Sequence, residues 1–144
     1  MRPSILGICF LVALGCSDST GPAPLDLSGV WQYSENISAP SVGVSCTSSG
    51  TVTVNQSGAN FTGIAVAEEG ICSDSQGTVI DNTGTQSISG GQVRGNTVSF
   101  QVPNCQLTGT VSGNPPNQMS GTETCTIALA GSNITFTGTW QASR

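Results

Sequence analysis

Two glutamates, Glu35 and Glu123, occur where polar and apolar residues alternate, and each falls on the apolar side of its stretch. Glu35 shares its face with Trp31 and Tyr33. A carboxylate held away from water needs a charged or hydrogen-bonding partner, or its pKa rises. We therefore consider both acids as groups that orient the polar end of a ligand.

The strand pairing that we expect sets Glu123 opposite Leu107 on one side and Trp140 on the other, which also turns its side chain inward. Three alternatives need no ligand. The register could differ by one residue, a β-bulge could turn the acid outward, or neighbouring hydroxyls could satisfy a buried carboxyl by hydrogen bonding.

Other groups that carry enzymatic chemistry are missing from the sequence. It has no histidine, no glycine-rich phosphate loop and no nucleophile motif. The cysteines of the body all have expected partners, so none is a free thiol. We predict a protein that is not an enzyme and needs no cofactor.

Several acids gather between residues 68 and 81, and such oxygen ligands suit calcium. Their spacing matches no EF-hand loop, so we expect a solvated acidic rim and no metal site. These acids are Glu68, Glu69, Asp74 and Asp81.

Alternation with a period of two runs through most of the chain after residue 28 and predicts eight strands separated by turn residues. The expected bounds are 29–37, 46–56, 61–68, 86–94, 97–102, 105–112, 118–129 and 134–144. Eight antiparallel strands joined mostly by short hairpins can close and leave no exposed edge. We predict an all-β fold: an eight-stranded antiparallel up-and-down β-barrel, with a β-sandwich as the alternative.

The cysteines test this register. If residues 113–117 form a hairpin loop centred on Pro115, partners sum to about 230, and Cys105 faces Cys125. The loop 57–60 likewise brings Cys46 to within about one residue of Cys72. Four cysteines allow three connectivities, and only Cys46 with Cys72 and Cys105 with Cys125 agrees with both hairpins.

Strand direction assigns each connection to an end of the barrel. The turns at 57–60, 95–96 and 113–117 lie at one end, which we expect to be closed. The longer connections 38–45 and 70–85 lie at the other end with both disulfides, so we expect any binding site at that mouth. The alternative is that the disulfides simply stabilise a small secreted barrel.

The N-terminus is typical of a secretory signal over residues 1–15, because the apolar run Ile5–Leu14 is too short to span a bilayer. The letters LVALGC resemble the signal of a bacterial lipoprotein, which implies a lipidated Cys16 as the mature N-terminus. The alternative is plain secretion, with Cys16 left over. Residues 16–28, rich in Ser, Gly and Pro, are predicted to be a flexible tether before a domain over 29–144. Disulfides agree with export to an oxidising compartment.

The charge balance limits the partners. Beyond the signal only Arg94 and Arg144 are cationic, against eight carboxylates. Nucleic acids and anionic lipid headgroups are poor partners for that balance. We expect a monomer held at the membrane of the cell envelope by its lipid, facing the periplasm or the exterior.

Both ends of the body resemble one family. Gly29-Val30-Trp31 looks like the entry to the first strand of lipocalins and related calycin barrels, and residues 138–144, GTWQASR, are similar to the end of many small bacterial lipocalin-like lipoproteins. In lipocalins an arginine of the last strand packs over that tryptophan, which implies that Arg144 reaches Trp31. The resemblance also implies a barrel able to hold a small apolar ligand.

Aromatic side chains on the predicted interior face could line such a cavity. An eight-stranded barrel is only just wide enough for its own side chains, so they could equally form a filled core. They are Trp31, Tyr33, Phe100, Phe136 and Trp140.

Three functions remain open. The first is an envelope binding module for a small hydrophobic ligand, with the interior aromatic residues and the two acids around it. The second is a structural or protein-interaction lipoprotein with a filled barrel. The third, less favoured, is an inhibitor of an enzyme that uses the mouth loops.

Overall fold

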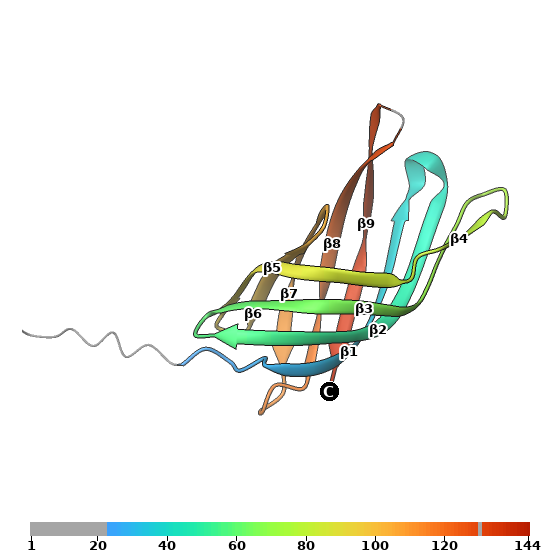
Figure 1. The fold of residues 1–144 in the computed structure, drawn as a ribbon. Coiled ribbons are helices and arrows are strands. Elements are labelled where there is room, and N and C mark those ends of the chain that lie inside the picture. The colour runs from blue at the N-terminus through green and yellow to red at the C-terminus, as the bar shows by residue number, and fades with distance from the viewer. Residues whose placement is uncertain (1–22, 130) are drawn as a thin grey trace, which may run out of the picture.

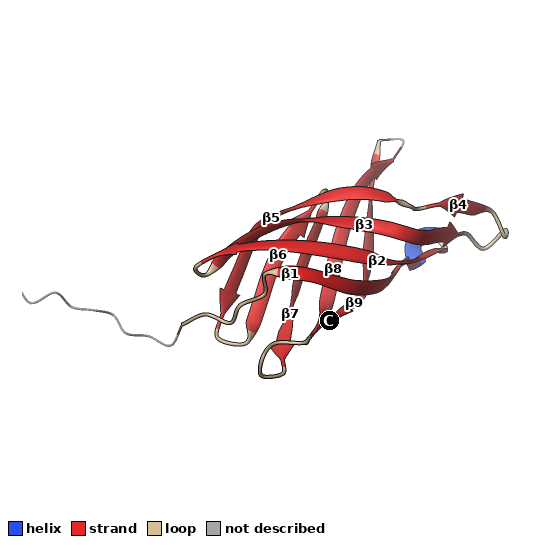
Figure 2. Cartoon of the chain, turned by 60° about the horizontal axis from the view of Figure 1, so that its bottom comes forward, coloured by secondary structure: helices blue, strands red, loops and turns tan. Residues whose placement is uncertain are grey.

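The computed structural model describes residues 23–129 and 131–144, so the predicted signal peptide, Cys16 and most of the predicted tether lie outside the described residues. The described chain is almost entirely antiparallel β-structure with one short 3-10 helix, η1 (Figure 2). The elements are β1 (Gly29–Ala39), η1 (Pro40–Val42), β2 (Val44–Ser57), β3 (Asn60–Ser73), β4 (Val79–Asp81), β5 (Gly84–Arg94), β6 (Thr97–Val102), β7 (Cys105–Ser112), β8 (Gln118–Leu129) and β9 (Ser132–Ser143). None of the described helices has the length and apolar character that crossing a membrane would need.

Eight of the strands close into a barrel. The order runs β2-β1-β9-β8-β7-β6-β5-β3, and the pairing of β2 with β3 completes the circle. β4 is a ninth strand that pairs only with β3, outside the closed circle (Figure 1). The predicted eight-stranded antiparallel barrel is confirmed, and the β-sandwich is not formed.

The predicted register is confirmed where the cysteines tested it. Cys105 pairs with Cys125 across β7 and β8, and Cys46 pairs with Cys72 across β2 and β3. Both pairs are disulfides, with S–S distances of 2.04 Å and 2.02 Å respectively. A β-bulge at Ser49/Gly50 absorbs the one-residue offset that the second hairpin required.

Two sequence expectations are wrong, one about a connection and one about a strand pairing. Residues 70–85 are not one long loop, because β3 continues to Ser73 and β4 pairs back onto its end. Glu123 does pair with Leu107, but its partner on β9 is Gly138, while Trp140 pairs with Gly121. The shift is two residues, and since side chains alternate with a period of two, both still face inward.

One end of the barrel is closed by the segment before β1. Leu27 and Trp31 are fully buried, and the Trp31 indole N–H donates to the Leu27 carbonyl oxygen at 2.8 Å. Gln56 accepts from the Leu27 amide at 2.7 Å and donates to the Leu25 carbonyl at 2.8 Å. Residues 25–28 therefore belong to the folded body, and the flexible tether predicted over 16–28 is wrong for this part.

Arg144 completes the closed end. Its guanidinium carbon lies 4.3 Å from the centre of the Trp31 ring, which confirms the contact that the family resemblance implied. The same side chain donates to the carbonyl oxygens of Pro116 at 2.9 Å, Ser28 at 2.7 Å and Asp26 at 3.0 Å. The last strand, the β7–β8 connection and the segment before β1 are thus joined at one point.

Glycines on the inner face make room for the largest side chain of the interior. Trp140 lies over Gly121 and Gly109, which are paired across β8 and β7. A β-carbon on Gly109 would lie 2.6 Å from Cζ2 of Trp140 and would also collide with the Ser120 carbonyl oxygen. Because no side chain fits there, the tryptophan can lie over β8 and β7 and reach Phe100 of β6, 5.3 Å away between ring centres in an edge-on arrangement.

The end that carries the disulfides is packed on one side. The β8–β9 hairpin and the β1–β2 connection extend beyond the shorter strands β5 to β7 (Figure 1). Between them lies a second apolar cluster, separate from the main core, whose buried members are Ile37, Ala39, Cys46, Cys125 and Phe136. Side chains therefore fill the part of the predicted mouth that lies between β1, β2, β8 and β9.

Candidate functional site

A cavity lies inside the barrel between the closed end and the disulfide cluster. Its volume is about 70 Å³. Most of its wall is apolar, from the main core, and Leu27 forms part of it next to the closed end. The apolar residues of the wall include Val52, Val54, Phe61, Ile88, Phe100, Leu107, Met119 and Trp140.

The cavity reaches solvent beside the β4–β5 connection. Asn82, Gly84 and Gln86 are among the residues that line it, and Gly84 and Gln86 are exposed. Access is therefore at the rim beside β3, β4 and β5, on the end that carries the Cys46–Cys72 disulfide, because β4 pairs with the end of β3 that contains Cys72.

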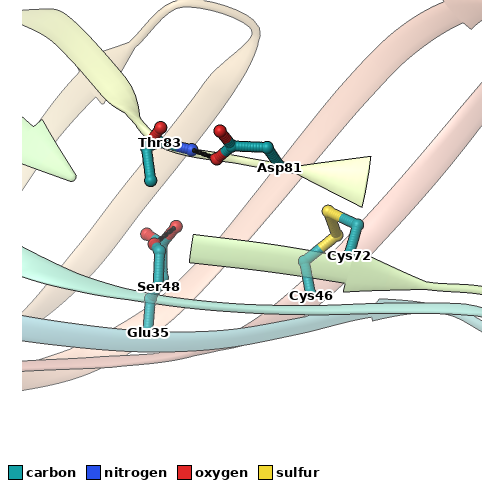
Figure 3. Close-up of a disulfide and its surroundings, with 6 residues drawn as sticks. All are labelled: Glu35, Cys46, Ser48, Cys72, Asp81 and Thr83. Atoms are coloured by element: carbon teal, nitrogen blue, oxygen red, sulfur yellow. Dashed lines mark hydrogen bonds between the residues drawn. A yellow bond between two sulfur atoms is a disulfide. The ribbon is translucent and has the colours of Figure 1, made fainter. Parts of the chain in front are cut away.

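Polar groups converge on one part of the wall. Glu35 of β1 and Ser48 of β2 are directly opposite each other, both line the cavity, and the Ser48 hydroxyl donates to the Glu35 carboxylate. Figure 3 shows the two side chains on the side of the β1–β2 pair that also carries the Cys46–Cys72 disulfide. Tyr33, two residues before Glu35, lines the same wall and is half-buried.

Glu123 is the most deeply buried acid of the described chain. It is 3% exposed, and its Oε1 atom has no hydrogen-bond partner. A carboxyl oxygen of Glu123 lies within 4.8 Å of both sulfurs of the Cys105–Cys125 disulfide. On β9 it faces Gly138, which has no side chain, and the next residue along that row is Ile37 of β1.

Burial raises the pKa of both acids, and the charge of Glu35 adds to the shift at Glu123. Burial, and secondarily the charge of Glu35, raises the pKa of Glu123 to about 8. Burial raises the pKa of Glu35 as well, and the hydrogen bond from Ser48 opposes that shift. Loss of hydration also raises the pKa of Tyr33, with a smaller effect from the charge of Glu35. Near neutral pH the interior therefore holds a protonated carboxyl next to an acid of raised pKa.

The structure brings together only part of the predicted ligand-binding set. Tyr33, Glu35, Phe100 and Trp140 line the cavity. Three predicted residues do not line it. Trp31 is buried at the closed end, Phe136 belongs to the disulfide cluster, and Glu123 lies beside the Cys105–Cys125 disulfide. The aromatic side chains thus divide between a cavity wall and a filled core.

Sequence reasoning missed Ser48, whereas the opening of the cavity lies beside the connection 70–85, at the end where we predicted the mouth. Ser48 could have been found, because the β1–β2 hairpin register sets it directly opposite Glu35. Asn82 carries no such signal, since its position depends on β4 folding back onto β3, whereas Gln86 is placed by the pairing of β5 with β3.

Two of the four acids of the predicted rim, Asp74 and Asp81, hold turns. Asp74 accepts hydrogen bonds from the amides of Gln76 at 2.9 Å and Thr78 at 2.8 Å, and Asp81 accepts from the Thr83 amide at 2.8 Å. These backbone bonds lower the pKa of both aspartates. Figure 3 shows Asp81 and Thr83 in this contact. The geometry accounts for these acids by turn formation.

Among the described residues, three side chains of types that can bind a metal ion lie close together: Cys105, Glu123 and Cys125. The two sulfurs are bonded to each other, so neither is a thiolate, and the group does not fit a metal ion.

Comparison of the chain with protein-family models, with curated proteins and with solved structures finds no match.

Proposed function

We propose that the protein is an exported, lipid-anchored binding protein of the calycin type, whose barrel takes a small, mainly apolar ligand. The observation that carries the proposal is the interior cavity, which joins an apolar wall to a few convergent polar groups. This combination is typical of small-molecule sites, where the apolar wall supplies affinity and the polar groups fix the ligand's orientation.

The volume limits the size of the ligand. A dry cavity of about 150 Å³ admits benzene, and ligand pockets for drug-sized molecules are about 300 Å³ or more. At about 70 Å³, this cavity suits a molecule of a few heavy atoms, or one end of a longer ligand that enters beside β4.

Tryptophan fluorescence tests the proposal. Trp140 lines the cavity and Trp31 does not, so short alcohols should change the emission of the Trp31→Phe variant saturably and leave that of Trp140→Phe unchanged. Lipid-sized ligands such as palmitate should bind at least ten-fold more weakly than the short alcohols. Both variants should first be shown to fold by circular dichroism. A flat response from folded wild-type protein would contradict the proposal.

The small volume also favours a second candidate, a barrel with a filled interior that acts as a structural or protein-interaction lipoprotein. If this second candidate is right, filling the cavity with larger side chains does not affect the activity of the protein. Ala65→Leu and Ala67→Leu, which place larger side chains at two cavity-lining positions, would then leave the biological activity intact, whereas they would abolish ligand binding on the first.

The proposed anchor is tested separately, by metabolic labelling with a radioactive fatty acid in a bacterial host. Wild-type protein should be labelled and sediment with membranes, and Cys16→Ser should be unlabelled. Equal labelling of both would remove the anchor from the proposal and leave the binding function standing.

A further inference from the structure

The two disulfides of the barrel are built alike. Each joins residues that are directly paired across neighbouring strands, Cys46 with Cys72 on β2 and β3, and Cys105 with Cys125 on β7 and β8. In each bond one cysteine is buried, Cys46 at 5% exposed and Cys125 at 2%, and the other is half-buried. The main difference between them lies in the acids nearby.

A buried acid lies beside the Cys105–Cys125 bond. Glu123 is on the same strand as Cys125 and two residues before it, so both side chains face inward. A carboxyl oxygen of Glu123 lies within 4.8 Å of both sulfurs, and its Oε1 atom has no hydrogen-bond partner. A buried polar atom without a partner calls for an explanation, and here its neighbours are two sulfur atoms.

The Cys46–Cys72 bond has no such neighbour among the residues that the structure describes, because no acid there has an oxygen within 4.8 Å of both sulfurs. Figure 3 shows Glu35 and Asp81 around this bond, and each already accepts a hydrogen bond. These two acids therefore have partners of their own.

The position of Cys105 decides how a thiol would meet the first bond. Cys105 begins β7 directly after Pro103 and Asn104, which are exposed. An incoming thiolate therefore reaches Cys105, and the buried Cys125 is the leaving group. A thiolate left on Cys125 would be costly in this environment, because burial disfavours an unpaired charge. A proton donor beside that sulfur removes the charge as it forms.

We propose that Cys105–Cys125 is a thiol-exchange site, whose substrates are dithiols and whose proton donor is Glu123. We call this bond the exchange site, and Cys46–Cys72 the structural bond. The proposal is independent of the binding function, because neither the two cysteines nor Glu123 line the cavity.

The exchange takes two steps. A thiolate of the dithiol attacks Sγ of Cys105 and forms a mixed disulfide, and the electron pair of the broken S–S bond goes to Sγ of Cys125. Cleavage frees the Cys125 side chain to rotate toward Glu123, from which its sulfur takes a proton. The second thiol of the dithiol then loses its proton to solvent and attacks the dithiol's own sulfur in the mixed disulfide. Cys105 leaves as a thiolate, and it and the Glu123 carboxylate each regain a proton from solvent. The protein disulfide is thus reduced to two thiols, and the dithiol is oxidised to a cyclic disulfide.

The protonation state of Glu123 fits this role. Burial, with a smaller contribution from the charge of Glu35, raises its pKa to about 8, so the carboxyl holds a proton near neutral pH. An ordinary thiol has a pKa of about 8.5, and such a match favours proton transfer in either direction. The titratable groups that act on Glu123 or feel its charge are Glu35 and Tyr33 of β1, while β7 and β9 present Leu107 and Gly138.

The wild-type protein tests the difference between the two bonds without any substitution. Full-length protein is treated with dithiothreitol, quenched with iodoacetamide at timed intervals and digested, and mass spectrometry follows the alkylation of each cysteine. We expect the exchange site to be reduced about ten-fold faster than the structural bond, or more, near pH 7. Its rate constant per dithiothreitol thiolate should fall as the pH rises through about 8, where Glu123 loses its proton.

Glu123→Gln keeps the shape of the side chain and removes the proton that it can give. This variant should slow reduction of the exchange site about ten-fold or more, remove the pH dependence of the rate constant and leave the structural bond unchanged. Glu69→Gln is the matched control, because it replaces a glutamate at an exposed position and should change none of these rates. Circular dichroism checks that both variants fold.

The same quench with the monothiol 2-mercaptoethanol locates the first attack. The mixed disulfide should form on Cys105, and one that forms on Cys125 would overturn the proposal.

Three other results would overturn it. The first is equal reduction of the two bonds in folded wild-type protein, or reduction of neither. The second is a rate at the exchange site that Glu123→Gln leaves unchanged. The third is a slower rate in Glu123→Gln without any pH dependence in the wild type, because the acid would then act through packing and not through its proton.

Discussion

The chemistry of this barrel depends on single residues in its interior. The Oε1 atom of Glu123 has no hydrogen-bond partner, whereas the Glu35 carboxylate accepts a hydrogen bond from the Ser48 hydroxyl. Their raised pKa values make the stability of the protein depend on pH even when no ligand is present.

The sign of this dependence follows from Glu123. Its pKa is 4.5 in an ordinary environment and about 8 in the folded protein. The folded state therefore holds the proton more tightly than the unfolded state. The contribution of Glu123 to the free energy of unfolding is fully present below about pH 4.5 and is lost as the pH rises through 8. Glu35 acts in the same direction, because its pKa is also raised. Asp26, Asp74 and Asp81 have lowered pKa values, so they change the stability only at acidic pH, below the range in which Glu123 titrates.

We expect the free energy of unfolding to fall by on the order of 4 kcal/mol between about pH 5 and pH 9. Urea denaturation at each pH measures it. Glu123→Gln cannot ionise and should flatten most of the slope, whereas Glu69→Gln, at an exposed position, should keep it. A slope that is the same in Glu123→Gln and wild type would show that another group causes the dependence.

At the scale of elements, the closed end joins parts that are distant in the sequence. Arg144 follows β9 and donates to carbonyl oxygens before β1 and in the β7–β8 connection, while its guanidinium covers Trp31. These contacts hold Leu27 in place as part of the cavity wall. The integrity of the cavity therefore depends on the segment before the first strand.

Arg144→Ala should lower the free energy of unfolding by about 2 to 3 kcal/mol, because it removes a cation–π contact and a set of charged hydrogen bonds. Arg144→Lys keeps the charge but not the planar fork, and should lose about half as much. Arg94→Ala is the control, since it removes the same charge where the side chain is exposed and bonds Gln92, and should cost under about 0.5 kcal/mol. Equal losses for Arg144→Ala and Arg94→Ala would contradict this role.

At the scale of the whole molecule, closure of the sheet decides what remains exposed. The barrel strands have partners on both sides, and β4 alone among the described strands has one neighbour. β4 is 3 residues long and carries the exposed side chains Val79 and Ile80, with Ile71 of β3 beside it. Short edge strands are poor templates for pairing with another chain.

We therefore expect a monomer at micromolar concentration, as the sequence also predicted. Sedimentation equilibrium of protein without the signal and lipid measures the mass. The short edge is the surface most open to association, so Ile80→Lys should lower any residual tendency to associate at high concentration. A stable dimer that Ile80→Lys leaves intact would contradict both statements.

Much of this architecture could be predicted from the sequence. Period-two alternation marked the strands, and loop positions set the hairpin register well enough to pair Cys46 with Cys72 and Cys105 with Cys125. These features are local, because a hairpin relates residues that its own turn brings together. The same reasoning oriented Glu35 and Glu123 toward the interior.

The cavity itself was decided by the tertiary structure. Whether an inward aromatic residue lines a space or fills one depends on neighbours from several strands: Gly109 of β7 leaves room for Trp140 of β9, while Phe136 packs against the disulfides. Leu27 closes one end from a segment without alternation, and β4 determines where solvent enters. These positions depend on contacts between residues far apart in the chain, which no period along the sequence records, and so only the closed barrel defines the candidate site.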